Sequence, residues 1–400
     1  MFTNINDAID WVTARRNTGH TFERFKEVCL SLDNPQNNFY TIHVAGTNGK
    51  GSTVAYLRDL LMSQGYKVGT LQSPHYITHL DRIRINNNNI SDEAFLRILN
   101  DNYEFFIEKD LSMFEIDYLI MCYYFKQENV DFAIVEVGIG GRLDATNVVD
   151  NTKLSIITTI GFDHMELLGD TLAKICYEKC GIIKENSKVL IGHLDNECIE
   201  VVRKQADIKK AKLFELGNYD ALDNRMFKYD DETYQINSYA KYQIHNACLA
   251  IKAFKIIGED INLSIDMAKA KQALEKTIWQ NRFEIVKENP RVILDGAHNP
   301  HGIQALVNSY SQFTGSKCII FSALKRKDYK NMVEILDKNC DELIITKFDN
   351  YGVIDINEFE RYKTYEDYIE AINYAINNYD NVLICGSLYF LSDVVLNYKF

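Results

Sequence analysis

The residues best suited to chemistry in this sequence follow a short apolar run near its N-terminus. Residues 41–53 read TIHVAGTNGKGST, and five of them carry the chemistry: Gly46, Gly49, Lys50, Gly51 and Ser52. Glycines let a backbone bend and approach a ligand because they have no Cβ atom. The lysine and the N-terminus of a following helix offer positive charge, and the serine hydroxyl can reach a Mg²⁺ ion. The segment predicts a nucleotide phosphate site. Its spacing departs from the strict pattern G-x-x-x-x-G-K-[ST], and an ordinary strand–turn–helix connection is the alternative.

Three more polar residues lie within or shortly after other apolar runs. Ser73 follows one run, Glu136 lies inside a second, and His164 follows a third; the runs span residues 66–72, 131–138 and 154–161 in that order. A lone glutamate among apolar residues is costly to bury unless it is paired or bound to a metal. Ligands of open α/β sheets bind beyond the carboxyl ends of the strands. We therefore expect the three residues to share one site, although a strand cap or a structural histidine is the alternative for each alone.

These candidates are positioned by an alternation of strand and helix patterns. Apolar runs predict strands at 40–45, 66–72, 131–138 and 154–161, and a second series at 291–295, 317–322, 342–347 and 381–386. Helical patterns cover or join them at residues 4–32, 52–64, 91–106, 111–129, 172–181 and 243–255. Such alternation predicts an α/β fold with a mostly parallel sheet between helices. Because 400 residues exceed a single core, we expect two domains. We place the linker at residues 288–290, between domains 1–288 and 289–400.

Composition narrows the class of protein. The chain is 46% hydrophobic and 25% charged with a formal net charge of −12, which is typical of a soluble globular protein and disfavours a nucleic-acid binder. The first ten residues lack the pattern of a signal peptide, and no apolar run reaches the roughly 18 residues of a membrane span. Nine scattered cysteines indicate reduced thiols. We expect a cytoplasmic protein with no membrane or nucleic-acid partner.

The motif A-G-T-N-G-K-G-S resembles the ATP loop of the Mur ligase superfamily, and most closely that of folylpolyglutamate synthase and dihydrofolate synthase. At least five further motifs follow in the family's order, including GIGGRLDATN at residues 138–147 and DGAHNP at 295–300. The resemblance implies an N-terminal P-loop-type, ATP-binding domain with a mostly parallel sheet, and a smaller Rossmann-like C-terminal α/β domain that serves glutamate ligation. The sequence departs from the family before Thr41, where no F-G-[IL]-x-P-G segment occurs, at Asp81, where the family has glutamate, and at Gln280 and Asn281, which replace Pro-Gly.

The resemblance also implies a role for each matching residue. The expected ATP-binding residues are Gly46, Thr47, Asn48, Gly49, Lys50, Gly51, Ser52, Asn246, Arg282 and Asp295. The expected ligands of two Mg²⁺ ions are Ser73, Glu136 and His164. The expected pteridine-binding residues are Ser112, Phe114, Asp144 and Ala145, and Asp144 would accept two parallel N–H bonds. The expected catalytic residues are Lys50, Lys179 and His298, with Lys179 carbamylated by CO₂ to N6-carboxylysine, which requires a neutral amine.

The implied reaction is an ATP-dependent ligation. ATP would phosphorylate the carboxylate of dihydropteroate, of a reduced folate, or of both, and the amine of L-glutamate would displace phosphate from the acyl phosphate. The expected partners are these small molecules, and we expect a monomer. The alternatives are another Mur-type ligase that joins an amino acid to a UDP-linked cell-wall precursor, a P-loop nucleotide-binding protein without a ligase step, and an inactive folate-binding homologue. ATP consumption that requires both glutamate and a pteridine acid separates them.

Overall fold

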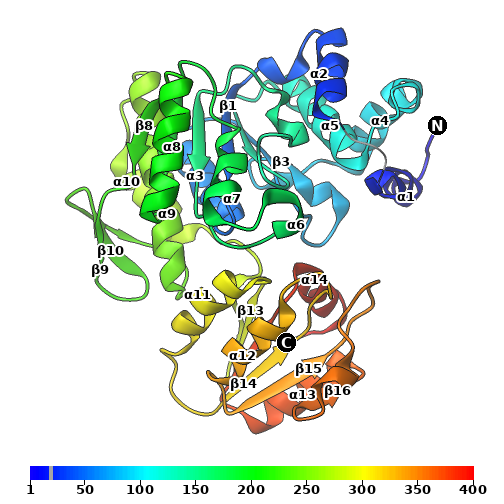
Figure 1. The fold of residues 1–400 in the computed structure, drawn as a ribbon, viewed down its shortest axis with the longest axis vertical. Coiled ribbons are helices and arrows are strands. Elements are labelled where there is room, and N and C mark those ends of the chain that lie inside the picture. The colour runs from blue at the N-terminus through cyan, green and yellow to red at the C-terminus, as the bar shows by residue number, and fades with distance from the viewer. Residues whose placement is uncertain (18–20) are drawn as a thin grey trace. The chain divides into compact units, whose positions relative to one another are not determined.

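The computed structural model describes residues 1–17 and 21–400 and divides into two compact units (Figure 1). The first unit contains Met1–Asn218 and Asn246–Thr277, and the second contains Tyr219–His245 and Ile278–Phe400. Among the described residues, none of the helices combines the length and the apolar character needed to cross a membrane.

The first unit is built on a sheet in which eight strands are described, in the order β4-β3-β2-β5-β1-β6-β7-β8. The strands are β1 (Tyr40–Ala45), β2 (Val68–Leu71), β3 (Ile83–Ile85), β4 (Asn88–Asn89), β5 (Phe132–Glu136), β6 (Leu154–Ile157), β7 (Lys188–Ile191) and β8 (Lys212–Glu215). All pairings are parallel except those of β3 with β2 and with β4. Strand β5 is buried along its whole length, as near-continuous apolar strands are in parallel sheets covered on both faces.

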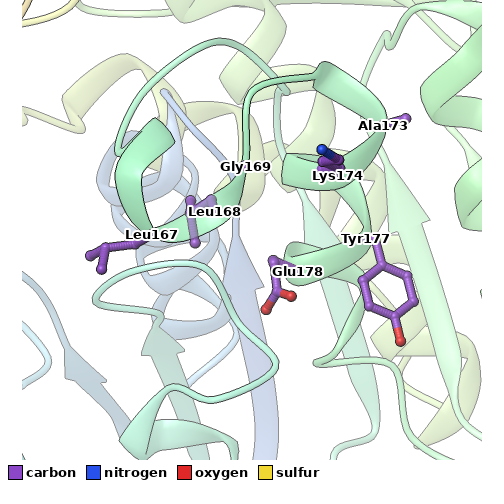
Figure 2. Close-up of a pocket in the computed structure, with 7 residues that line it drawn as sticks. All are labelled: Leu167, Leu168, Gly169, Ala173, Lys174, Tyr177 and Glu178. Atoms are coloured by element: carbon purple, nitrogen blue, oxygen red, sulfur yellow. The ribbon is translucent and has the colours of Figure 1, made fainter.

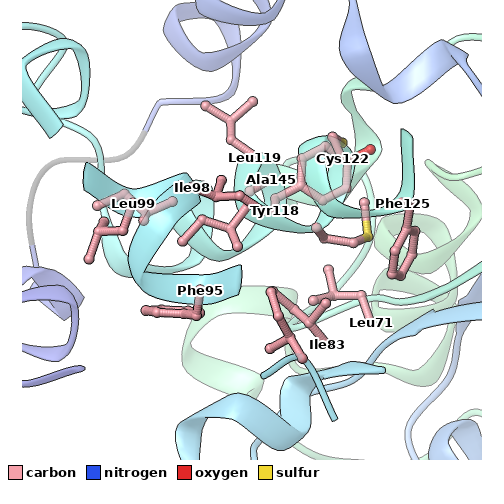
Figure 3. Close-up of a cluster of buried hydrophobic side chains, with 14 of the residues drawn as sticks. Leu71, Ile83, Phe95, Ile98, Leu99, Tyr118, Leu119, Cys122, Phe125 and Ala145 are labelled. Carbon is pink, nitrogen blue, oxygen red and sulfur yellow. The ribbon is translucent and has the colours of Figure 1, made fainter. Parts of the chain in front are cut away.

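Helices cover this sheet. They are α1 (Ile5–Ala14), η1 (Arg15–Asn17), α2 (Phe22–Ser31), η2 (Pro35–Asn37), α3 (Lys50–Ser63), η3 (His79–Arg82), α4 (Asp92–Glu108), α5 (Met113–Gln127), η4 (Ala145–Val148), α6 (Met165–Leu168), α7 (Leu172–Cys180), α8 (Asn196–Ile208), α9 (Lys241–Asp260, shared with the second unit) and α10 (Met267–Lys276). Figure 3 shows part of one hydrophobic core, where Phe95 of α4 and Tyr118 and Phe125 of α5 pack near Leu71 and Ile83 of the sheet. This core fixes the start of α5, where two candidate site residues lie.

The second unit holds a six-stranded sheet and a three-stranded antiparallel sheet among its described residues. The larger sheet has the order β12-β13-β17-β14-β15-β16 and comprises β12 (Arg282–Glu288), β13 (Arg291–Asp295), β14 (Lys317–Phe321), β15 (Glu342–Thr346), β16 (Lys363–Tyr365) and β17 (Asn381–Cys385). The smaller sheet comprises β9 (Tyr219–Ala221), β10 (Met226–Tyr229) and β11 (Glu232–Gln235). The helices are α11 (Pro300–Tyr310), α12 (Tyr329–Asp337), η5 (Ile356–Phe359), α13 (Tyr368–Asn378) and α14 (Leu388–Asn397).

Successive residues of β13 enter different cores of the second unit. Ile293 packs in one cluster with Leu306 of α11, whereas Val292 packs in another with Leu391 of α14. Neighbouring residues of a strand point to opposite faces, so both faces of this sheet are covered. Among the described strands of this six-stranded sheet, β12 alone runs antiparallel to its neighbour. The predicted α/β class is confirmed: one unit has a large, mostly parallel sheet, and the second unit has a smaller sheet of its own.

Two expectations differ in detail from the structure. Helix α3 begins at Lys50 rather than Ser52, so the lysine belongs to the first turn of the helix. Of residues 288–290, interpreted above as a linker, Glu288 ends β12 and residues 289–290 form the turn that joins the antiparallel strands β12 and β13. The packing units separate after Thr277, and the assignment of domains to residues 1–288 and 289–400 stays a prediction. In the N-terminal helical prediction, residues 18–20 lie outside the described part of the chain.

Candidate functional site

The glycine-rich loop between β1 and α3 has a backbone that only glycine suits. Gly49, at the N-cap of α3, has φ 85°, a left-handed conformation that side chains disfavour. A Cβ atom on Gly49 would lie 2.4 Å from Asn246 Oδ1, and one on Gly46 would lie 1.9 Å from Thr158 Oγ1. The loop thus packs closely against Thr158, the residue directly after β6, and against Asn246 of α9. The structure brings Asn246 to the loop, and its contact with ATP stays a prediction.

The residues after β6 brace this loop through hydrogen bonds. The Thr47 N–H donates to the Thr159 carbonyl at 2.8 Å, and the Thr47 hydroxyl and Gly161 exchange two hydrogen bonds of 3.0 Å. The Thr158 hydroxyl donates to the Asn48 carbonyl at 2.6 Å. Thr47 and Asn48 therefore shape the loop. The first N–H groups of α3, which have no acceptor within the helix, are those that suit a phosphate.

Two lysines contact the carbonyl of Gly46, and one of them lies near a glutamate. Lys50 Nζ lies 3.2 Å from this oxygen and 3.9 Å from Glu136 Oε1, and Lys179 Nζ lies 3.1 Å from it. Lys179 is 4% exposed. Burial, followed by the positive charge of Lys50, lowers the pKa of Lys179 to about 7. A large neutral fraction is therefore present near neutral pH, and the neutral amine is the form that reacts with CO₂.

Ser73, Glu136 and His164 are associated with the carboxyl ends of parallel strands in the same sheet. Glu136 is the last residue of β5 and is 5% exposed. Ser73 follows β2 by two residues and precedes a cis peptide bond to Pro74, while His164 caps α6 with φ 50°. Each ring nitrogen of His164 lies 3.8 Å from a carboxylate, on Asp163 or on Glu166. Within residues 1–17 and 21–400, no three His, Cys, Asp or Glu side chains are grouped to hold a metal unaided.

Phe114 and Asp144 border the same small space. A Cβ atom on Gly138 would lie 2.9 Å from Phe114 Cε1 and 3.1 Å from Asp144 Oδ2. The carboxylate is held by backbone donors, since Ile139 N–H donates to Oδ2 and Thr146 N–H donates to Oδ1, both at 3.0 Å. An aromatic face beside a fixed carboxylate suits a flat ring that carries N–H groups.

The other two pteridine candidates have evident structural roles. The Ser112 hydroxyl donates to Glu115 Oε2 at 2.7 Å, and the pair forms a capping box at the start of α5. This arrangement is a standard device for satisfying the first N–H groups of a helix. Ala145 is buried in the apolar cluster of Figure 3. Their contact with a ligand stays a prediction.

In the second unit, Asp295 is a buried acceptor at the end of β13. Its Oδ2 accepts from the Phe283 N–H at 2.8 Å and from the Tyr242 hydroxyl, and its Oδ1 accepts from the Ala297 N–H at 2.8 Å. Burial raises the pKa of Asp295, while the charge of Arg282 opposes this effect. Tyr242 is not among the predicted site residues, because no distinctive local pattern marks it in the sequence.

Arg282 and His298 lie close to Gly296, the residue after Asp295. His298 Nδ1 donates to the Gly296 carbonyl at 2.8 Å, and a Cβ atom on Gly296 would lie 2.3 Å from Arg282 Nη1. The three predicted residues of this unit therefore gather at the carboxyl end of β13. Their action on a nucleotide stays a prediction.

A separate pocket of about 460 Å³ lies between α6 and α7. Figure 2 shows Leu167 and Leu168 on one side of it and Lys174, Tyr177 and Glu178 of α7 on the other. None of the predicted site residues lines it.

The sequence of this chain is similar to those of known proteins. The chain matches the Mur ligase middle domain over residues 44–254 and the Mur ligase glutamate ligase domain over residues 281–388. It is 34% identical to the dihydrofolate synthase/folylpolyglutamate synthase of Bacillus subtilis, over 98% of this chain and 99% of that protein. A protein of the same description from Escherichia coli is 29% identical over 89% of this chain and 86% of its own length.

Solved structures show the same fold. Escherichia coli FolC in complex with DHPP and ADP superposes with a TM-score of 0.85 at 27% identity, covering 97% of this chain and 96% of that one. Folylpolyglutamate synthase of Mycobacterium tuberculosis, complexed with ADP and AMPPCP, has a TM-score of 0.88 at 23% identity, with coverage of 99% and 100%.

Proposed function

Because this chain belongs to the Mur ligase superfamily and, within it, to the dihydrofolate synthase/folylpolyglutamate synthase family, we propose that it uses ATP to join L-glutamate to the carboxylate of a pteroate or folate substrate. The observation that supports this most directly is that Lys50 and Lys179 both contact the Gly46 carbonyl, with Glu136 beside Lys50, at the start of a helix that can bind phosphate.

The reaction has two steps that leave atoms and charge balanced. The substrate carboxylate attacks the γ-phosphorus of ATP, which gives an acyl phosphate and ADP. The amine of glutamate then attacks the acyl carbon, loses a proton, and expels inorganic phosphate as the amide forms. Lys50 and the first N–H groups of α3 would neutralise charge on the transferring phosphoryl group.

We propose Mg²⁺ as the cofactor, held by Ser73, Glu136 and His164. The donors fit the ion in part: hydroxyl and carboxylate oxygens are its preferred ligands, whereas an imidazole is unusual. Glu136 is buried beside Lys50, and a carbamate on Lys179 would add anionic oxygens near the two lysines that meet at the Gly46 carbonyl. Bound Mg²⁺ would neutralise phosphate charge.

For the acid substrate we propose dihydropteroate, a reduced folate, or both, with the pteridine between Phe114 and Asp144. We further propose that the protein acts as a monomer in the cytoplasm. The nine cysteines are consistent with a reducing compartment, since all nine are free thiols and eight are buried.

Gly138→Ala should raise the KM for the pteridine acid by about tenfold, because the added methyl group would intrude between Phe114 and Asp144. The backbone tolerates alanine there, since Gly138 is not among the residues with positive φ. Steady-state kinetics with each substrate varied in turn measures the effect. Equal changes in the KM values for ATP and glutamate would contradict a pteridine site at this place.

Glu136→Gln should raise the Mg²⁺ concentration needed for half-maximal activity by about tenfold, because a neutral amide is a weaker ligand than a carboxylate. Glu178→Gln is the matched control: Glu178 adjoins Lys179 in sequence but pairs with the exposed Arg142 at 3.0 Å. Coincident Mg²⁺ titrations of wild type and Glu136→Gln would exclude Glu136 as a ligand.

The function itself is tested with purified protein, ATP, Mg²⁺ and glutamate, supplied with dihydropteroate, tetrahydrofolate or a UDP-linked cell-wall precursor, and with products resolved by mass. We expect a mass increase of one glutamyl residue on a pteridine acid, with ATP consumed only when both acid and glutamate are present. A product on the UDP-linked precursor would favour the other class of Mur ligase. ATP hydrolysis in the absence of both the pteridine acid and glutamate would favour a nucleotide-binding protein with no ligase step.

A further inference from the structure

A chain of buried hydrogen bonds runs from Asp144 into the middle of the first unit's sheet. The Thr146 hydroxyl donates to Asp144 Oδ1 at 2.5 Å, and His43 Nε2 lies 2.8 Å from the same hydroxyl. Thr146 and His43 are both fully buried. No motif in the sequence drew attention to His43 or assigned Thr146 a role.

The hydrogen-bond types determine where the protons lie. The Asp144 carboxylate only accepts, so the Thr146 hydroxyl must donate to it, and the Thr146 oxygen then accepts from His43. His43 is therefore the tautomer with its proton on Nε2. Its Nδ1 is buried and has no hydrogen-bond partner among residues 1–17 and 21–400. Burial, followed by the charge of Lys184, lowers the pKa of His43 to about 3 and keeps the ring neutral.

Strand register places His43 where it can support Asp144. In the parallel pairing, His43 is level with Val135 of β5 and with Ser155 of β6, and neighbouring strands hold it on both sides. It stands three residues before Gly46 on β1. Strand β1 therefore leads into the phosphate loop and also carries His43, the inner end of the hydrogen-bond chain from Asp144.

We propose that Thr146 and His43 are positioning residues, which hold the Asp144 carboxylate as an oriented anionic acceptor for the ring N–H groups of the pteridine substrate. The inference rests on the proposed function and deepens it. Oδ1 is engaged by the N–H and hydroxyl of Thr146, while Oδ2 is the oxygen beside Gly138 and Phe114. Donors to the carboxylate favour its charged form and fix its plane, and the His43 proton directs the Thr146 hydroxyl towards Oδ1.

The first test compares variants with the pteridine acid that the ligation assay identifies. Thr146→Val replaces the hydroxyl by a methyl group and should raise the KM for that acid by about tenfold, with kcat and the KM for ATP within about twofold of wild type. Thr146→Ser keeps the hydroxyl and should restore the wild-type KM. Thr70→Val is the matched control, since Thr70 of β2 is also fully buried but its hydroxyl has no hydrogen-bond partner in the described chain.

Asp144→Ala separates failure of the inference from failure of the proposed site. If Asp144→Ala raises the KM for the pteridine acid and Thr146→Val does not, the pteridine site stands and the positioning role is overturned. If neither variant changes this KM, both the site and the inference are overturned. An equal rise for every substrate in Thr146→Val would indicate general loss of structure and would also overturn the positioning role.

The second test does not depend on activity or on a foldable variant. In wild-type protein labelled with ¹⁵N-histidine, long-range proton–nitrogen NMR should show His43 with its proton on Nε2 and a bare Nδ1, unchanged between about pH 8 and pH 5. A ring protonated on Nδ1, or one that becomes charged in this range, would overturn the hydrogen-bond chain on which the proposal depends.

Discussion

Lys50→Ala should lower turnover by about a hundredfold or more, the usual range for removing a preorganised group that stabilises transition-state charge. In the structure Lys50 Nζ contacts the Gly46 and Thr47 carbonyls at 3.2 and 3.3 Å, and bound ATP would offer phosphate oxygens in their place. The KM for the pteridine acid should change much less, because the Asp144 carboxylate is held by the N–H groups of Ile139 and Thr146. Steady-state and single-turnover measurements of ADP formation test the prediction.

The fold of Lys50→Ala should be intact. The loop takes its shape from Gly46 and Gly49 and from the hydrogen bonds of Thr47 with the segment after β6. Circular dichroism and the melting temperature check this directly. Lys174→Ala is a suitable control, since Lys174 is an exposed lysine of α7 that pairs with Asp170 at 2.8 Å. Near wild-type turnover in a folded Lys50→Ala protein would contradict the placement of ATP on this loop.

Lys50→Ala should also change the second lysine. The charge of Lys50 contributes to the low pKa of Lys179, so its removal should raise that pKa and reduce the neutral fraction near pH 7. Any carbamate on Lys179 should then form less readily in the variant than in the wild type. The two lysines are thus coupled, and their variants should not be treated as independent.

Lys179→Ala should be nearly inactive, with turnover lowered by about a hundredfold or more, and should be partly rescued by short-chain carboxylic acids. The reason is electrostatic: an ammonium 3.1 Å from the Gly46 carbonyl and close to Lys50 would repel a metal, whereas a carbamate would reverse the charge and offer two oxygens. A free carboxylic acid can occupy the space that alanine leaves. Lys179→Arg should resist rescue, because the guanidinium fills the space and stays charged.

The modification can be observed directly. With a pKa of about 7, the fraction of neutral Lys179 rises as pH increases through 7 and falls below it. Labelling with ¹³CO₂ should therefore give a carbamate signal that strengthens from about pH 6 to pH 8 and is missing in Lys179→Ala. A bare amine at Lys179 in the active, Mg²⁺-bound protein would contradict this prediction.

Local sequence patterns predict the elements of the fold and the kind of chemistry. Its apolar runs located the strands that carry the candidate residues, because periodicity and turn residues are local properties of a chain. Three glycines beside a lysine, directly after an apolar strand, indicated a phosphate loop for the same local reason. The isolated Glu136 could be singled out because burying a charge is costly whatever the surrounding fold.

Packing between distant segments sets which side chains meet. The proximity of Lys50, Lys179 and Glu136, the space that Gly138 leaves between Phe114 and Asp144, and the chain from Asp144 through Thr146 to His43 depend on strand register and on helix packing between distant segments. Residues 288–290 show what composition leaves open: it suits a linker or a tight turn equally. The antiparallel pairing of β12 with β13 shows that a tight turn joins the two strands. His43 had a usable signal, a polar residue within an apolar strand, but its partner lies 103 residues away along the chain. The packing of the sheet determines a hydrogen bond over that separation. Local sequence constrains the backbone conformation but does not specify contacts between distant segments.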